Sequence, residues 1–472
     1  MRTIVGRDFE KDELESFYQS DVSEFVAVYG RRRVGKTFLI REFFRDRFDF
    51  YLTGLANGGF SEQMANFNLA LREAGLKDLP LAKNWIYAFQ QLRMLIEKSR
   101  KKKKVIFLDE MPWLDTPKSK FMSALEHFWN SWASGRNDIL LIVCGSSTTW
   151  MTDKLLNNKG GLHNRITHQL RLEPFTLKEC AAYVKSLKFT WSQHQVAECY
   201  MALGGIPYYW SLLKKGKSVD QNIDHLFFGA NARLKDEYKN LYEALFKNSD
   251  KYMQVVEALS KKSSGLTRQE IVESIEESSG GGLTKILEDL ENCGFIRSFQ
   301  AYNKKSRDRI FQLCDFYTLF YFRFVRRAGR DKKYWKSMMD TTQHRAWAGY
   351  AFEQLCTMHV DQLKHALGIS GVYCNVYSWR SPAGTDKGAQ IDLIIDRNDN
   401  VINLCEMKFS AHPFVINKKY ADEIKNKSGT FRSVTNTKKS VFLTFVSSSG
   451  LAQNVHSGIV QCEIELKDLF AV

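Results

Sequence analysis

A phosphate-binding loop between residues 25 and 40 constrains this chain more than any other stretch. The segment reads FVAVYGRRRVGKTFLI, with Gly35, Lys36 and Thr37 at the start of an apolar helix. The spacing G-x-x-x-x-G-K-T places glycines where the backbone must curl around a phosphate chain, so that N–H groups and a helix N-terminus point at the anion. Lys36 can then reach the β- and γ-phosphates, and the Thr37 hydroxyl can bind Mg²⁺. Because an apolar strand precedes the loop and an amphipathic helix follows it, we predict a nucleotide site formed by Gly30, Arg31, Arg32, Arg33, Val34, Gly35, Lys36 and Thr37.

Two carboxylates at the end of a second apolar strand would complete a nucleotide hydrolase site. Residues 105–108 read VIFL and are followed by Asp109 and Glu110. When strands alternate with helices, the strands form a parallel sheet whose ligands collect at the strand carboxyl ends. Asp109 would hold Mg²⁺ directly or through water, and Glu110 would orient or deprotonate the attacking water. A further buried strand ends next to Ser146 and Ser147, which could sense the γ-phosphate or form a plain polar turn.

The charge balance favours an anionic partner. The 472 residues include 68 Lys and Arg against 53 Asp and Glu, which gives a net charge of +15. Nucleic acid, DNA above all, is the first candidate, because a basic surface supplies affinity without specifying sequence. A generally solvated basic surface is the alternative. The basic run at 98–104 directly precedes a strand, so we interpret it as a solvated strand entrance and not as a nucleic-acid patch.

The cysteines and the hydropathy of the chain indicate the cellular compartment in which we expect the protein. The nine cysteines are scattered and contain no C-x-x-C pair, which argues against a disulfide framework or a zinc cluster and fits a reducing cytoplasm. No uncharged apolar run approaches the roughly 18 residues of a membrane helix, and the N-terminus lacks the apolar core of a signal peptide. We therefore expect a soluble cytoplasmic protein without membrane association, and the length predicts about three domains.

The motifs of the first half resemble those of a known ATPase family. In chain order they are VGR at 5–7, the phosphate loop, LDE at 108–110, CGSS at 144–147, NRI at 164–166, LEPF at 172–175 and GGIPY at 204–208. In this combination they resemble the prokaryotic AAA+/STAND-related ATPases of the archaeal ATPase group, over about residues 1–235. The resemblance implies a five-stranded P-loop core and a helical lid that carries the GGIP turn.

The same resemblance assigns roles to individual residues. It implies the phosphate and Mg²⁺ contacts of the loop described above, with Asp109 as the second Mg²⁺ carboxylate and Glu110 as the catalytic base. Arg7 belongs to a segment that could lie against the nucleotide base. Arg165 lies just before a strand and is the implied arginine finger, which could complete the site of a neighbouring subunit, so we expect a homo-oligomer. No arginine of the lid can be matched to the family pattern.

Residues 246–335 have the pattern of three short helices and a hairpin. Thr267 is a predicted N-cap, the glycines at 280–282 break the chain, and the hairpin turns at 303–309. This is the pattern of a winged helix, which resembles the linker module of the same family and could place its third helix in a DNA groove. That helix, at 283–290, is predominantly acidic, so we favour a scaffold over direct base reading.

Asp392 and the sequence Glu406-Met407-Lys408 form a second candidate centre. Alternation along a strand places Glu406 and Lys408 on the same side, and Asp392 on the preceding hairpin strand can meet them. The two carboxylates could bind Mg²⁺, and the lysine could position or activate a water and stabilise developing charge. Alternating charges on a half-exposed strand often produce the same pattern, so the pattern alone does not establish a metal site.

The arrangement around this centre resembles the PD-(D/E)XK nuclease fold over about residues 345–450. A predicted helix carries Glu353, a hairpin carries Asp392, and the E-x-K strand is followed by a basic helical stretch at 412–427. Similar domains end many ATPases of the group named above.

This second resemblance implies that Asp392, Glu406 and Lys408 are the metal-binding and catalytic set, with Glu353 as a fourth acid. Gln390 departs from the family pattern, because relatives often have an acid there, which would weaken or alter the metal site. Many copies of this fold are inactive binding modules, so cleavage and binding both stay open.

We predict an α/β protein with a P-loop parallel-sheet ATPase core at 1–175, a helical lid and connector at 176–245, a winged helix at 246–335 and a restriction-endonuclease-like α/β domain at 336–472. The predicted function is an ATP- and Mg²⁺-dependent ATPase that controls a DNA nuclease using Mg²⁺ or Mn²⁺, in defence or in handling mobile DNA. The alternative is an ATP-dependent switch whose C-terminal modules bind DNA or protein without cleaving it. A third hypothesis is a sequence-specific transcription regulator that reads bases with the winged helix.

Overall fold

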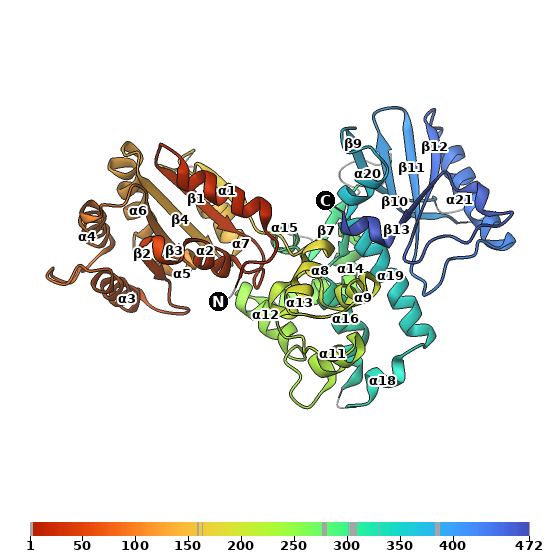
Figure 1. Cartoon of the computed structure of the whole chain (residues 1–472), viewed down its shortest axis with the longest axis horizontal. Helices are drawn as coiled ribbons and strands as arrows, with labels where there is room; N and C mark the ends of the chain where they lie inside the picture. The colour runs from red at the N-terminus through yellow and green to blue at the C-terminus, as the bar shows by residue number, and fades with distance from the viewer. Residues whose placement is uncertain are drawn as a thin grey trace. The chain divides into compact units, whose positions relative to one another are not determined.

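The computed structural model describes residues 3–157, 160–162, 164–275, 281–300, 302, 309–329, 331–382 and 388–471 (Figure 1). The chain divides into two compact units, Met1–Pro174 and Phe175–Val472, and each is described by itself. Of the predicted hairpin turn at 303–309, only Arg309 belongs to the described residues.

The first unit contains a five-stranded parallel sheet in the order β2-β3-β4-β1-β5. Its strands are β1 (Glu24–Tyr29), β2 (Phe48–Thr53), β3 (Lys104–Asp109), β4 (Ile139–Gly145) and β5 (His168–Arg171). Every residue of β3 and β4 is buried, which explains why both read as continuous apolar runs and not as alternating patterns. The predicted parallel-sheet P-loop core is confirmed.

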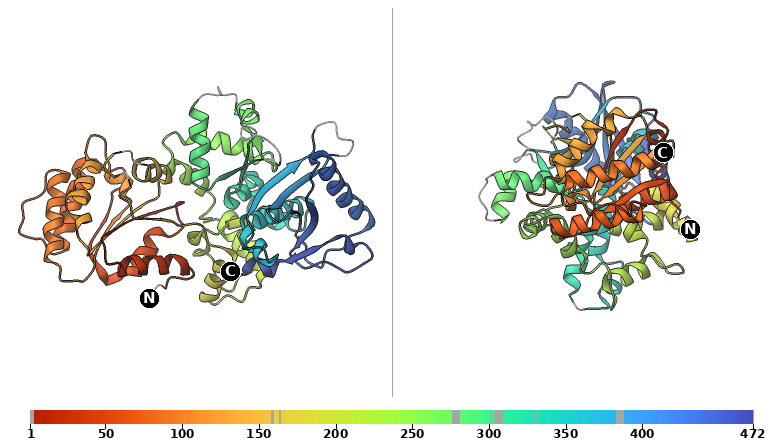
Figure 2. Two further views of the ribbon diagram at one scale, coloured as in Figure 1. Left: turned by 90° about the horizontal axis from the view of Figure 1, so that it is seen from above. Right: turned by 90° about the vertical axis from the view of Figure 1, so that its left-hand side faces the viewer.

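Helices lie on both sides of this sheet (Figure 2). They are α1 (Asp8–Gln19), α2 (Lys36–Phe44), η1 (Arg45–Arg47), α3 (Phe60–Glu73), α4 (Trp85–Lys98), α5 (Met111–Leu114), α6 (Phe121–Ser131), η2 (Ala133–Gly135), α7 (Thr148–Trp150) and η3 (Met151–Leu156). Side chains of α3, α4 and α6, among them Phe67, Trp85 and Phe128, join alternate residues of the strands in one apolar core.

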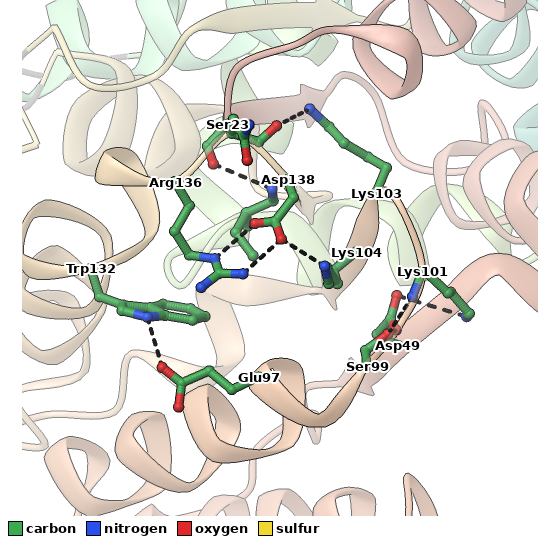
Figure 3. A network of polar contacts seen from close by, with 12 residues as sticks. Ser23, Asp49, Glu97, Ser99, Lys101, Lys103, Lys104, Trp132, Arg136 and Asp138 are labelled. Atoms are coloured by element: carbon green, nitrogen blue, oxygen red, sulfur yellow. Dashed lines mark hydrogen bonds and ion pairs between the residues drawn. The ribbon is translucent and has the colours of Figure 1, made fainter.

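Three of the four lysines at 101–104 donate hydrogen bonds to other parts of the protein (Figure 3), and two of them, Lys103 and Lys104, are buried. Lys103 Nζ donates to two carbonyl oxygens at 2.5 and 2.8 Å, and burial lowers its pKa. Lys101 Nζ donates to two others at 2.9 and 3.0 Å, and Lys104 Nζ donates to Asp138 at 2.6 Å. The run lies at the entrance of β3, as predicted, and its basic residues from Lys98 to Lys102 are exposed. The description as solvated fails for Lys103 and Lys104, which are buried and fix the entrance in place.

Asp138 is the anionic centre of this network. It accepts hydrogen bonds from Lys104 Nζ at 2.6 Å and from Arg136 Nε and Nη2 at 2.7 and 2.6 Å. Burial alone would raise its pKa, but the bonds from Arg136 and Lys104 outweigh burial and lower the pKa to about 2.

We expect Asp138→Asn to destabilise the first unit by about 3 kcal/mol, because Arg136 and Lys104 would lose their anionic partner. The carboxylate's contribution to stability is complete above its ordinary pKa of 3.8 and is lost as the pH falls toward about 2. Thermal unfolding of the full chain at neutral pH should show a transition lowered by several degrees. Asp12→Asn, an exposed change on α1, should leave the melting curve unchanged. Identical curves for both variants would contradict this account of the network.

The second unit begins with helices, of which α8 and α11 pack on α9. They are α8 (Leu177–Ser186), α9 (Gln193–Leu203), α10 (Pro207–Trp210), α11 (Val219–Ile223), η4 (Asp224–Phe228) and α12 (Glu237–Leu245). Gly205, in the GGIP turn, lies against the LEPF motif: Phe175 N donates to Gly205 O at 2.6 Å. A Cβ at Gly205 would lie 1.9 Å from Phe175 O, so only glycine fits there.

A three-helix segment with a small antiparallel sheet follows. Its elements are α13 (Ser249–Ser260), β6 (Leu266–Thr267), α14 (Arg268–Ile275), α15 (Gly281–Asn292), β7 (Ile296–Phe299) and β8 (Ile310–Leu313), with the sheet in the order β6-β8-β7. The predicted N-cap is confirmed, because Glu270 N donates to Thr267 Oγ1 at 3.3 Å. The predicted glycine break is wrong for Gly281 and Gly282, which form the start of α15, and Gly280 lies outside the described residues.

The remaining helices lead to the C-terminal sheet. They are α16 (Phe316–Phe320), η6 (Tyr321–Val325), α17 (Arg326–Ala328), α18 (Tyr334–Met338), α19 (Thr342–Met358) and α20 (Val360–Ala366). The buried His359 joins α19 to α8: its Nε2 accepts from Leu177 N at 3.1 Å, and its Nδ1 lies 2.9 Å from Leu355 O. Burial lowers the pKa of His359 to about 4, so the ring is neutral at pH 7.

The C-terminal sheet is mixed, in the order β13-β12-β11-β10-β9. Its elements are β9 (Cys374–Arg380), β10 (Gln390–Arg397), β11 (Val401–Lys408), α21 (Lys418–Thr435), β12 (Ser440–Ser447), η7 (Ser457–Ile459), β13 (Cys462–Glu465) and η8 (Leu466–Phe470). The pairs β9–β10 and β10–β11 are antiparallel, whereas β11–β12 and β12–β13 are parallel. The basic helix predicted at 412–427 begins only at Lys418, where Asn417 caps it by accepting from Tyr420 N at 2.9 Å, and it runs to Thr435.

Among the described residues, no helix has the length and apolar character needed to cross a membrane.

Candidate functional site

The phosphate loop has the backbone geometry that the motif predicts. Gly30 and Gly35 have φ angles of 140° and 92°, which non-glycine residues rarely adopt. A Cβ at Gly30 would lie 2.3 Å from Leu172 O, so the loop also needs glycine there for space. Gly35 is the N-cap of α2, and its carbonyl oxygen accepts from Leu39 N at 2.8 Å. The free N–H groups at this helix start can bind an anion.

Lys36 points into the loop. Its Nζ donates to Gly30 O and Arg31 O, each at 2.9 Å, and its side chain is 5% exposed. The ammonium group is therefore held inside the curl of the loop. Arg31 is buried, Arg33 has a φ of 73°, and Arg32 is partly exposed, so the three arginines have different environments within one loop.

Thr37 and Asp109 meet across the end of the sheet. Thr37 Oγ1 donates to Asp109 Oδ1 at 2.9 Å, and Thr53 Oγ1 lies 3.4 Å from Asp109 Oδ2. Asp109 is 2% exposed, and burial raises its pKa. A hydroxyl and a buried carboxylate in contact supply oxygen ligands of the kind that Mg²⁺ prefers. Thr53 at the end of β2 was not predicted, since nothing in its local sequence marks it.

Glu110 is fixed by Ser146 of the adjacent strand end. Ser146 N and Ser146 Oγ both donate to Glu110 Oε2, at 3.0 and 2.9 Å. Glu110 itself has φ 47° and ψ 47°, a left-handed conformation that costs free energy for a non-glycine residue. Ser146 therefore touches the predicted base, and its predicted role as a γ-phosphate sensor stays a prediction.

The two other predicted arginines have different surroundings. Arg7 is 5% exposed, and its guanidinium donates to Glu173 O at 2.7 Å, Val34 O at 3.4 Å and Glu10 Oε1 at 3.0 Å. These bonds join the N-terminal turn to the phosphate loop, and the predicted role of Arg7 at the nucleotide stays a prediction. Arg165 is exposed, as an arginine finger must be.

In the C-terminal sheet, Glu406 is bound by three side chains. Its carboxylate accepts from Lys427 Nζ at 2.8 Å and Tyr420 OH at 2.5 Å, and it pairs with Lys408 Nζ at 3.1 Å. Burial alone would raise the pKa of Glu406, but Lys408 and Lys427 outweigh burial and lower it. Tyr420 and Lys427 were missed by the sequence reasoning. Their spacing of seven places both on one face of α21, which is the signal that could have indicated them.

Asp392 and Glu353 lie near this group. The register pairs Leu393 with Cys405, so Asp392 occupies the position facing Glu406 on the next strand. Gln390 Nε2 donates to Asp392 Oδ1 at 2.6 Å, as expected for side chains two apart on one face. Burial, followed by the charges of Asp392 and Glu406, raises the pKa of Glu353 to about 8.

The structure thus brings the predicted Asp, Glu and Lys residues into one electrostatic group, but not into a metal cage. Within the described ranges, no set of three or more His, Cys, Asp or Glu side chains is arranged to hold a metal ion. The donor oxygens of Asp392 and Glu406 suit Mg²⁺ or Mn²⁺ chemically, whereas the Glu406 oxygens are bonded to Lys427, Tyr420 and Lys408.

Comparison with known proteins supports the ATPase domain predicted for the first half of the chain. Residues 4–213 match the model of an ATPase domain that occurs predominantly in Archaea. An uncharacterized protein of Methanocaldococcus jannaschii is 23% identical over 413 residues, which cover 86% of this chain and 87% of that protein. The chain therefore carries an archaeal-type ATPase domain.

Two solved structures match this chain at low sequence identity. A Walker-type ATPase of Pyrococcus abyssi is 17% identical, with a TM-score of 0.49, over 67% of this chain and 95% of that chain. The ORC2 protein of Aeropyrum pernix is 13% identical, with a TM-score of 0.39, over 66% of this chain and 90% of that chain. The family match ends at residue 213, so it does not test the functions predicted for the C-terminal modules.

Proposed function

We propose that this chain is an ATP hydrolase, and that the nucleotide state of its first half controls a centre for DNA cleavage in its C-terminal sheet. The observation that carries the hydrolase proposal is the contact of 2.9 Å between Thr37 Oγ1 and Asp109 Oδ1. It joins the phosphate loop to the strand end that also bears Glu110, so the residues proposed for phosphate binding, for cation binding and for base catalysis would act together.

The residues would act as follows. The N–H groups at 35–37 and the Lys36 ammonium would bind the β- and γ-phosphates, and Thr37 and Asp109 would hold Mg²⁺. Bound ATP would supply the γ-phosphoryl group, and Mg²⁺ would neutralise charge on its oxygens. Glu110 would orient the attacking water and accept its proton, which requires the carboxylate to loosen its bonds to Ser146. The exposed Arg165 would complete the site of a second copy of the chain, which fits a homo-oligomer.

The test is phosphate release by the full chain with ATP and Mg²⁺. Lys36→Ala should lower the rate at least about 100-fold, since the loop loses its cation toward the β- and γ-phosphates. Lys98→Ala is the matched control, because Lys98 is an exposed lysine in the last turn of α4, and it should hydrolyse ATP at the wild-type rate. Equal rates in all three proteins would refute the hydrolase proposal.

Metal-dependent cleavage of DNA is the second proposed function. It is supported by the contacts of Glu406 with Lys408 and Lys427, at 3.1 and 2.8 Å, beside the carboxylate of Asp392. Carboxylates that bind a cation and lysines that face a phosphate are the parts that such a reaction needs. The alternative is a switch whose C-terminal modules bind DNA or protein without cutting. Measurements of metal binding distinguish the two, because a nuclease should have a second metal site that Asp392→Ala removes. Absence of such a site would favour the switch.

We propose that the winged helix is a scaffold. On α15, the position of a recognition helix, Lys285 is paired with Asp289 at 3.2 Å, and Glu288 is exposed. The described part of the hairpin end packs on the C-terminal sheet: Tyr302 N donates to Ser378 O at 3.0 Å. A surface with this charge repels phosphates and supports neither groove binding nor the transcription-regulator hypothesis. A footprint of fixed sequence on DNA would overturn this part of the proposal.

A further inference from the structure

Arg297 on β7 is hydrogen-bonded to a neutral side chain that is itself fixed by a second hydrogen bond. Its Nε and Nη2 donate to the single oxygen Oε1 of Gln312, at 2.9 and 2.6 Å. Gln312 in turn donates through Nε2 to Ser263 O at 2.6 Å. The bond to Ser263 fixes the orientation of the Gln312 amide, so its oxygen is aimed at Arg297. The guanidinium group is therefore held in one orientation by a neutral partner.

Among the residues that the structure describes, no carboxylate forms an ion pair with Arg297. Its guanidinium is hydrogen-bonded to Gln312, and the centroid of the Phe299 ring lies 5.8 Å away. The residue is half-buried, and a guanidinium group does not lose its proton in proteins. A half-buried cation without a contacting anion is costly unless something offsets the cost.

The Arg297 side chain lies beside the centre formed by Asp392, Glu406 and Lys408. Tyr350 OH of α19 donates at 3.1 Å to Ser263 O, the same carbonyl that fixes Gln312. Tyr350 is three residues before Glu353, so the two side chains share one face of α19. Asp392 is close enough to Arg297 for its charge to act on the guanidinium. Arg297, Glu353 and Asp392 thus border one region, although they come from three different elements.

We infer that Arg297 binds a backbone phosphate of DNA at the rim of the Asp392, Glu406 and Lys408 centre. This inference rests on the function proposed above for that centre and adds a residue from the winged-helix hairpin to it. A DNA strand that approaches several carboxylates needs fixed cations near them, and a guanidinium group matches two phosphate oxygens at once. The hairpin would then serve to supply this cation, which explains why it packs against the sheet and why α15 is unsuited to reading bases.

The test is the affinity of the full chain for a fluorescein-labelled DNA duplex, measured by anisotropy in EDTA so that neither metal nor cleavage contributes. Arg297→Gln should weaken binding about tenfold and reduce the slope of log K against log salt by about one, since one phosphate contact is lost. Arg297→Lys, which keeps the charge, should recover part of the affinity. Arg93→Gln, which changes a partly exposed arginine on α4, should bind within twofold of wild type.

Wild-type affinity and slope in Arg297→Gln would overturn the inference. Equal losses in the Gln and Lys variants, both with lowered melting temperatures, would also overturn it, because they would show a structural role. The proposed cleavage is tested separately with Glu406→Ala. If wild type cuts no DNA and Arg297→Gln still weakens binding, the phosphate site stands and cleavage fails. If wild type cuts and Arg297→Gln neither weakens binding nor slows cutting, cleavage stands and this inference fails.

Discussion

Replacing Glu110 with glutamine is expected to slow ATP hydrolysis about 1,000-fold and to leave ATP affinity within about threefold of wild type. A positioned base contributes about 10²- to 10⁴-fold, and glutamine keeps the size of the side chain but cannot accept the proton of water. Binding should persist because the proposed phosphate contacts involve the loop and Lys36, which Glu110→Gln leaves in place. Single-turnover hydrolysis and a separate measurement of ATP affinity would distinguish the two effects.

Ser146→Ala is the comparison that tests the assigned geometry. It removes the bond of 2.9 Å from Ser146 Oγ to Glu110 but keeps the bond of 3.0 Å from Ser146 N. We expect a loss of about tenfold or less, since the base keeps one of its two anchors. If Glu110→Gln turned over ATP as fast as Ser146→Ala, Glu110 would not be the base.

Glu406→Ala is expected to abolish DNA cleavage in the presence of Mg²⁺ or Mn²⁺, with a loss of at least about 1,000-fold. Glu406 is the carboxylate on which Lys408, Lys427 and Tyr420 converge, so its removal eliminates an oxygen ligand and leaves two lysines without their anion. The reaction should be followed on linear, supercoiled and single-stranded DNA, with and without ATP.

Asp422→Ala is the control for this variant, because Asp422 is an exposed acid on α21, the helix that also carries Tyr420 and Lys427. It should cut as wild type does. Cutting by Glu406→Ala at the wild-type rate would assign any nuclease activity to another site. Absence of cutting in every protein would leave the C-terminal sheet as a binding module controlled by the ATPase.

The first half could be predicted closely because its signals are local. The loop at 30–37 and the acids after β3 need particular residue types at fixed spacings, and parallel strands put their carboxyl ends at one edge. The bond between Ser146 and Glu110 could not be predicted in the same way. It depends on the rotation of two side chains at neighbouring strand ends, and Glu110 adopts a left-handed conformation that its sequence does not announce.

In the second half of the chain, the contacts that form the candidate site could be predicted less well. Alternation correctly placed Asp392 opposite Glu406, but the closest partners of Glu406 come from α21, 14 and 21 residues further along the chain. Such contacts depend on how a helix packs on a sheet, which a periodic pattern does not fix. Lys103 and Lys104 illustrate the same limit, because a run of charge was read as solvated while folding buried two of its members against carbonyl and carboxylate oxygens.

The most direct test of the ATPase account is the nucleotide that stays on the protein. Wild type, Lys36→Ala and Glu110→Gln would each be mixed with labelled ATP and Mg²⁺, separated from free nucleotide by rapid gel filtration, and analysed for bound ATP and ADP. The account predicts that wild type carries ADP, that Glu110→Gln carries unhydrolysed ATP, and that Lys36→Ala carries neither. Equal amounts of bound nucleotide on Lys36→Ala and wild type would contradict it.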